Sequence, residues 1–262
     1  MELAGYHCIE AERRDRVLTL RLNNPPLNAV DDRLHEELAR IFLDVQDDEA
    51  SDVIVLTGAG KAFSAGGDLR QMKAAWEAGR TRLRLSDAKR IVFSLLDLEK
   101  PIIARINGHA MGLGATIALF CDVIVMSTAA RIGDPHVAVG IVAGDGGAVI
   151  WPQLVGYARA KEYLMTGRQL GAEEAERIGL VNHAVAPEAL DRTVDDIADA
   201  LAAGSQQAIR WTKVSTNIGL KQLAHSIMDT SLAYEWLTFK SRDHAEAVNA
   251  FLEKRRPKFT GD

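Results

Sequence analysis

The sequence has little that would mark a secreted, membrane-spanning or disulfide-rich protein. Its 262 residues include two cysteines, Cys8 and Cys121, which are too few and too far apart for a disulfide framework or a metal knuckle. A reducing compartment, the cytoplasm, is therefore expected. The N-terminal segment has no apolar core of the kind that a signal peptide needs, and no apolar run approaches the ~18 residues of a membrane span. We expect no membrane partner.

An excess of positive charge is also missing. The chain carries 31 Lys and Arg against 36 Asp and Glu, a formal net charge of −5. Proteins that bind nucleic acids usually present a basic surface, so no nucleic-acid partner is expected. The one basic segment, RTRLRLSDAKR at 80–90, is interrupted by Asp87 and is interpreted as a solvated face.

The first half of the chain alternates strand-like runs, glycine loops and helix-like segments. This is the pattern of an α/β protein with its ligand loops at the carboxyl ends of the strands. After about residue 145 the pattern becomes mostly helical, and we place a boundary near residue 200 that separates a core (1–200) from a C-terminal helical region (201–262). The predicted strands are 17–22, 52–58, 101–108 and 122–127, and the clearest predicted helices are 31–45, 86–99 and 112–120.

Two glycine-rich loops follow predicted strands and lead into predicted helices. They are KAFSAGGDL (61–69) and NGHAMGLGAT (107–116). Neither matches a P-loop, and neither has the dinucleotide-binding G-x-G-x-x-G in its proper context. Each loop alone is typical of a tight connection between a strand and a helix. Together they could aim two backbone N–H groups at one oxygen and form an oxyanion hole.

Four segments taken together resemble the enoyl-CoA hydratase/isomerase (crotonase) superfamily. They are GKAFSAGGDL (60–69), NGHAMGLGATIALFCDV (107–123), GRQLGAEEAERIGLVNHAV (167–185) and FLEKRRPKF (251–259). The resemblance implies an α/β fold built as a spiral of repeated ββα units, with a helical C-terminal trimerisation region. It also implies a coenzyme A thioester as substrate, no separate cofactor or metal, and assembly as a homotrimer or hexamer.

The resemblance also assigns substrate contacts by position. The thioester carbonyl would accept hydrogen bonds from the backbone N–H groups of Gly67 and Leu113. Leucine replaces the family's usual glycine at position 113, which leaves the main-chain donor in place. The residues that the resemblance implies around coenzyme A are Leu27, Ala29, Ala65, Asp68, Leu69 and Lys254.

The two glutamates that hold and activate water in the hydratases are missing. By position, the first falls on Thr116 and the second on His136. A threonine hydroxyl cannot act as the base, although it can face a pocket and bind a water. An imidazole with a pKa near ~6.5 suits a general base at neutral pH. Asp145, nine residues after His136, could orient the imidazole or simply cap the helix that follows.

A second resemblance concerns the segment GDPHVAVGIVAGDGGAVIWPQLVG (133–156). It is similar to the β-diketone hydrolase branch of the same superfamily, typified by 6-oxocamphor hydrolase, in which a histidine and an aspartate activate water for carbon–carbon cleavage. His136 and Asp145 match that pair. His35 and Glu235 match a further pocket histidine and carboxylate. His35 is equally compatible with a helix surface, and Glu235 by itself is interpreted as a helix-surface charge.

These patterns predict an acyl-CoA-processing enzyme of the hydratase/isomerase class that uses a His/Asp pair. Two alternatives stay open. One is a hydrolase that cleaves a carbon–carbon bond in a β-diketone or β-ketoacyl-CoA. The other is a non-catalytic acyl-CoA-binding protein that has lost both glutamates.

Overall fold

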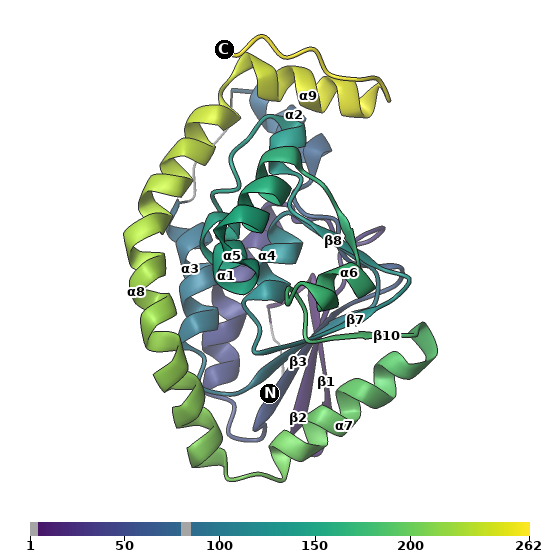
Figure 1. Cartoon of the computed structure of the whole chain (residues 1–262), viewed down its shortest axis with the longest axis vertical. Coiled ribbons are helices and arrows are strands. Elements are labelled where there is room, and N and C mark those ends of the chain that lie inside the picture. Colours follow the sequence, from purple (N-terminus) through teal and green to yellow (C-terminus); the bar gives the residue numbers. More distant parts are fainter. Residues whose placement is uncertain (1–4, 80–84) are drawn as a thin grey trace.

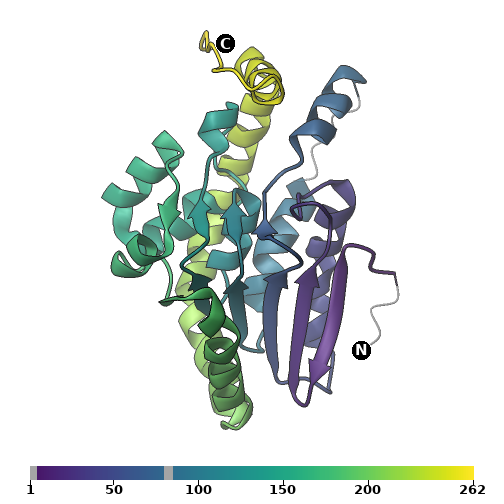
Figure 2. The same ribbon diagram turned by 90° about the vertical axis from the view of Figure 1, so that its right-hand side faces the viewer.

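A six-stranded sheet forms the larger layer of the protein. The computed structural model describes residues 5–79 and 85–262. The strand order is β1-β2-β3-β5-β7-β10, with β1 antiparallel to β2 and the other neighbours parallel. Figure 2 shows the first strands side by side at the edge nearest the N-terminus. The strands are β1 (Ile9–Arg14), β2 (Val17–Leu22), β3 (Val53–Gly58), β5 (Ile102–Ile106), β7 (Val123–Ser127) and β10 (His183–Val185).

A smaller sheet of four short strands completes the repeated ββα pattern. Its order is β4-β6-β8-β9, and β4, β6 and β8 directly follow the long strands β3, β5 and β7. The predicted crotonase-like spiral of ββα units is therefore confirmed. Two of these short strands lie inside segments that the sequence pattern had predicted as loops. The strands are β4 (Ala62–Ser64), β6 (His109–Met111), β8 (Arg131–Gly133) and β9 (Leu170–Gly171).

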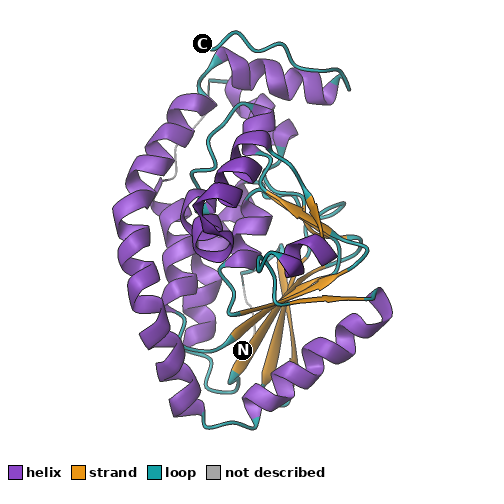
Figure 3. Cartoon of the chain, viewed as in Figure 1, coloured by secondary structure: helices purple, strands orange, loops and turns teal. Residues whose placement is uncertain are grey.

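Strand β3 shows why the larger sheet needs helices on both faces. All six of its residues are buried, as expected for a central parallel strand. Side chains alternate between the two faces, so Ile54 and Leu56 belong to the main core while Val53 and Val55 pack with residues of α7 (Leu190–Ala202) in a second cluster. Figure 3 shows most of the helices on one side of the sheets and α7 on the other.

The helices begin where the sequence signals predict. Asp31 caps the first helix, because its carboxylate accepts a 2.8 Å hydrogen bond from Leu34 N. Residues 80–84 of the basic segment lie outside the described residues, and a helix begins at Leu85.

Within the described part of the chain, no helix is long and apolar enough to cross a membrane. The helices before α7 are α1 (Asp32–Gln46), α2 (Leu69–Glu77), α3 (Leu85–Asp97), α4 (Leu113–Leu119), α5 (Gly147–Thr166) and α6 (Ala172–Arg177), with the short 3₁₀ helices η1 (His136–Val139) and η2 (Pro187–Ala189).

The C-terminal helices pack directly on the core. Helix α8 (Gln206–Phe239) runs along one side of the molecule, and α9 (Arg242–Leu252) crosses its end (Figure 1). Met228 and Leu232 of α8 are buried in the same cluster as the sheet residues. Residue 200 lies inside α7, and the division into 1–200 and 201–262 stays a prediction.

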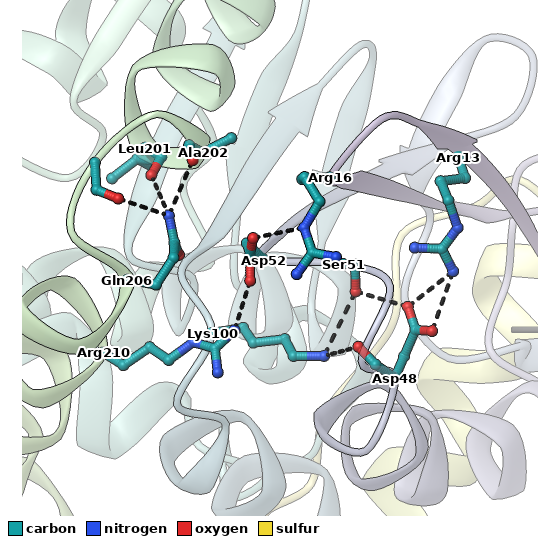
Figure 4. Close-up of polar contacts among 11 residues, drawn as sticks. Arg13, Arg16, Asp48, Ser51, Asp52, Lys100, Leu201, Ala202, Gln206 and Arg210 are labelled. Atoms are coloured by element: carbon teal, nitrogen blue, oxygen red, sulfur yellow. Dashed lines mark hydrogen bonds and ion pairs between the residues drawn. The ribbon is translucent and has the colours of Figure 1, made fainter.

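A buried lysine holds the connection between α1 and β3 in place (Figure 4). Lys100 is 2% exposed, and its ammonium donates hydrogen bonds to the carbonyl oxygens of Val45 at 2.7 Å and Asp48 at 2.5 Å. Burial lowers the pKa of this lysine. Nearby, Asp52 pairs with Arg210 of α8 at 2.8 Å, so the same region anchors the first turns of α8.

Candidate active site

The two glycine loops meet in the structure. Gly66 and Gly112 both have positive φ, 78° and 51°, a backbone conformation that favours glycine. A Cβ atom on Gly66 would lie 2.7 Å from the carbonyl oxygen of Met111 and 3.6 Å from the Cα of Gly112. Such contacts leave no room for a side chain, so the absence of Cβ lets the loops approach.

The residue after each of these glycines presents a free backbone N–H. Val30 and Gly67 form a parallel β-bridge, in which Val30 N donates to Gly66 O at 2.7 Å and Asp68 N donates to Val30 O at 3.1 Å. The N–H of Gly67 itself therefore points away from Val30. Leu113 is the first residue of α4, where an N–H has no acceptor inside the helix. Within the described ranges neither N–H has a hydrogen-bond partner. Both have the character of oxyanion-hole donors, and that role stays a prediction.

His136 lies between two carboxylates and beside the second loop. Its Nδ1 makes a short contact with Asp134 Oδ1, and its Nε2 lies 3.4 Å from Asp145 Oδ2. A Cβ on Gly112 would be 3.5 Å from Nε2, which places this edge of the ring next to the start of α4. The chain therefore doubles back and brings His136 and Asp145 together. The shorter contact, however, is with Asp134.

Thr116 and Asp145 form the opposite side of the cluster. The Thr116 side chain is fully buried in α4, and its hydroxyl donates a 3.2 Å hydrogen bond to Asp145 Oδ1. The N-cap residue of α5 is Gly146, and the carboxylate of the preceding Asp145 accepts the backbone N–H of Gly147 in the first turn. Asp145 therefore combines a contact at the helix terminus with contacts to Thr116 and His136.

The two carboxylates change the charge state of the histidine. Burial alone would lower the pKa of His136, but the charges of Asp134 and Asp145 outweigh it and hold the pKa well above its usual value. The sequence alone suggests an ordinary pKa near ~6.5, whereas these surroundings favour the protonated form of the ring. Burial also raises the pKa of Asp145, against the lowering effect of the His136 charge.

Glu235 of α8 supplies a third carboxyl group close to this cluster. Its Oε2 is buried without a hydrogen-bond partner among the described residues, and a Cβ on Gly144 would lie 2.7 Å from it. Burial, reinforced by the charge of Asp145, raises the pKa of Glu235 to about 8. Its carboxyl end is therefore enclosed and protonated at neutral pH, unlike that of a charged residue on a helix surface.

Glu235→Gln is expected to stabilise the fold increasingly as the pH rises from about 5 to 8. The pKa of this carboxyl rises from 4.5 in its unperturbed state to about 8 in the fold, so the unfolded chain ionises first and wild-type stability falls through this window. Glutamine cannot ionise, so the stability of the variant does not fall for this reason. Thermal unfolding at several pH values measures the difference, with the exposed Glu188→Gln as control. Equal pH dependence in Glu235→Gln and wild type would contradict the burial argument.

Asp134, His136 and Asp145 also form a donor set that a metal ion could use. Each ring nitrogen of His136 faces a different carboxylate, whereas a metal ion would bind one nitrogen only. The observed arrangement places one carboxylate at each ring nitrogen instead of gathering the three side chains around one point.

Comparison with known proteins identifies the family. The profile of the Enoyl-CoA hydratase/isomerase family matches residues 12–262. The chain belongs to this family.

Individual members of the family resemble the chain over nearly its whole length. It is 35% identical to the short-chain-enoyl-CoA hydratase of Clostridium acetobutylicum, over 94% of each chain. It is 36% identical to the crotonyl-CoA hydratase of Syntrophomonas wolfei, over 97% of this chain and 98% of that one. The crystal structure of an enoyl-CoA hydratase/isomerase from Mycobacterium paratuberculosis matches with a TM-score of 0.82 at 34% identity, covering 92% of this chain and 97% of that chain.

Several of the predicted coenzyme A contacts of this family member lie in the first loop or next to it. Ala65 N donates to Leu27 O at 3.0 Å, and both residues are exposed. The carboxylate of Asp68 caps α2 through the N–H groups of Arg70 and Gln71, so it is already engaged in the helix terminus. The binding roles of these residues stay predictions, as do those of half-buried Ala29, Leu69 and His35 and of exposed Lys254 at the end of α9.

Asp134 is the site residue that the sequence patterns did not single out. It is 1% exposed and makes the shortest contact to His136. A signal exists in the sequence, because Asp-Pro-His places a carboxylate two residues before the histidine. Only the turn at Pro135, however, decides that the carboxylate and the ring face each other.

Proposed function

We propose that the protein adds water to the double bond of an enoyl-CoA thioester, with Asp145 and His136 in place of the two glutamates of the hydratases. The observation that carries this proposal is the position of His136, an imidazole held between Asp134 and Asp145 beside Gly112, with surroundings that raise its pKa. Family membership and the names of the hydratase relatives support the substrate class.

The first step is the attack of water on C3 of the enoyl group. Asp145 accepts a proton from the water while the water oxygen forms a bond to C3. The electrons of the C2–C3 double bond move toward the thioester carbonyl, which becomes an enolate oxygen. The N–H groups of Gly67 and Leu113 stabilise this oxygen, because donors already oriented toward a developing charge need no reorganisation.

The second step is proton transfer to C2. His136 donates the proton on Nε2, the ring nitrogen nearest to Gly112 and the start of α4. The product is a 3-hydroxyacyl thioester. The proton held by Asp145 then returns to His136 across the 3.4 Å contact between Oδ2 and Nε2, which restores the starting state. The same two groups, used in the opposite order, catalyse the dehydration.

A hydrolase that cleaves a carbon–carbon bond is the second candidate. The observation that favours it is the third carboxyl group, since Glu235 lies near the same His/Asp pair that resembles the β-diketone hydrolase branch. In that reaction Asp145 activates water for attack on a ketone carbon. The bond to the neighbouring carbon then breaks, its electron pair enters the enolate at the oxyanion hole, and His136 protonates the new carbon terminus.

Mass-spectrometric turnover of a substrate panel tests both reactions. The panel contains crotonyl-CoA, longer enoyl-CoAs, 3-ketoacyl-CoAs and a cyclic β-diketone. Hydration adds the mass of one water to an intact acyl chain, whereas hydrolysis produces either two fragments or a ring-opened acid. We expect hydration of an enoyl-CoA. Binding of crotonyl-CoA by calorimetry without turnover of any compound would instead indicate a non-catalytic acyl-CoA-binding protein.

The proposal includes assembly as a homotrimer or hexamer, as the resemblance implies, and a cytoplasmic location, as the low cysteine content indicates. Light scattering of the purified protein distinguishes the two assemblies from a monomer.

A further inference from the structure

Asp134 contacts His136 directly, but the two steps of the proposed hydration assign it no role. Its side chain is buried, and among the described residues its one ion pair is with His136. Its Oδ2 is also buried and has no hydrogen-bond partner in the described part of the chain. Among the described residues, the imidazole is therefore the one basic group that the Asp134 carboxylate contacts.

The backbone of α5 packs closely against the Asp134 carboxylate and leaves no room for a side chain beside it. Gly147, the first residue of α5, lies directly against Asp134 Oδ2, and a Cβ at position 147 would overlap that oxygen. Oδ1 also receives the backbone N–H of His136, at 3.4 Å. This long bond contributes little to the turn, since hydrogen bonds weaken with distance. The much shorter contact is the one to the ring.

The two carboxylates that contact His136 differ in what they can do. Asp145 faces Nε2, the nitrogen nearest to the start of α4, and also accepts the Thr116 hydroxyl. Asp134 faces Nδ1, on the far side of the ring. A carboxylate on Nδ1 fixes the orientation of an imidazole and favours its protonated form without touching the reacting atoms.

We infer that Asp134 is the positioning residue of this site, which holds Nδ1–H of His136 so that Nε2–H points at the reacting carbon. This inference rests on the proposed hydratase function and assigns separate roles to the two aspartates, with Asp145 as the base and Asp134 as the orienting group. The charged or titratable groups that face His136 are Asp134 from its own loop, Asp145 from the segment before α5, and Glu235 from α8.

Asp134→Asn tests the inference through the pH dependence of crotonyl-CoA hydration. Hydration needs the imidazolium, so kcat falls as the pH rises through the pKa of His136. Removing the Asp134 charge lowers that pKa, and the alkaline limb of the kcat profile moves to lower pH. We expect kcat at its optimum to fall roughly 10- to 100-fold, the size of effect seen when an orienting carboxylate is lost, with KM changed less than about twofold. The exposed Asp196→Asn on α7 is the matched control and keeps the wild-type profile.

An NMR titration gives a second readout that does not depend on turnover. In wild-type protein with labelled histidine rings, the His136 signal is assigned by its loss in His136→Gln. We expect it to titrate well above the ordinary histidine range, and lower in Asp134→Asn. An ordinary value in wild type, or an alkaline limb that stays in place in Asp134→Asn, would overturn the inference. Absence of crotonyl-CoA turnover with a raised His136 pKa would count against the hydratase function alone.

Discussion

Replacing His136 by glutamine is expected to lower kcat/KM for the enoyl-CoA that the protein hydrates by ~10²–10⁴-fold, the range associated with loss of a general acid–base group. Glutamine keeps a polar side chain of similar reach but cannot carry a transferable proton at neutral pH. The oxyanion donors are main-chain atoms of other segments, so binding of the acyl-CoA survives. Steady-state kinetics together with calorimetric binding separate the two effects.

The control for this variant is His183→Gln. His183 is exposed in β10 and takes no part in the cluster around His136. We expect its kinetics to match wild type. Full turnover by His136→Gln on the true substrate would remove His136 from the mechanism, and a loss of binding rather than of kcat would point to a substrate contact instead.

Gly66→Ala is expected to reduce kcat by ~10²–10³-fold, the cost of losing one oxyanion-hole donor. A Cβ at this position would lie 2.7 Å from the carbonyl oxygen of Met111, so the two loops must separate. In the proposed oxyanion hole, Gly67 N–H and Leu113 N–H would then no longer converge on one oxygen. The measurement is kcat with the same thioester, accompanied by circular dichroism to establish that the fold is retained.

Gly60→Ala is the matched control because it separates backbone strain from loop contact. Gly60 also has a positive φ, 68°, but a Cβ there would meet nothing within 4 Å. The substitution therefore costs about 1 kcal/mol of stability from the left-handed backbone while leaving the loops together. A similar loss of kcat in both variants would mean that strain, rather than the approach of the loops, sets the activity.

The long strands were predictable because their sequences carry a strong local signal. Strands β2, β3, β5 and β7 are apolar and β-branched, and all four lie inside the larger sheet. Strand β1 was not predicted, because its sequence IEAERR is mostly charged and exposed at an edge of the sheet. Strands β4 and β6 escaped prediction for another reason. Each has three residues, and their pairing joins segments about 45 positions apart that no local pattern connects.

The site shows the same division between local signal and distant contact. Position within the family pattern was enough to select His136, Asp145, Thr116 and the two glycine loops as a group. It was not enough to select Asp134, or to place the carboxyl oxygen of Glu235 in the interior rather than on a helix surface. Those two facts depend on a turn at Pro135 and on the packing of α8 against the segment around Gly144.

The sequence by itself determined that the protein is an α/β chain of the crotonase type, with two glycine loops and with neither of the hydratase glutamates. Only the tertiary structure decided the charge state of the residue that replaces the second glutamate. The pKa of an imidazole depends on the charges within a few ångströms of it. Here those charges come mainly from the carboxylates at positions 134 and 145, which the fold brings to the two ring nitrogens. For that reason the fold holds the pKa of His136 above the ordinary value near ~6.5 that the sequence alone suggests.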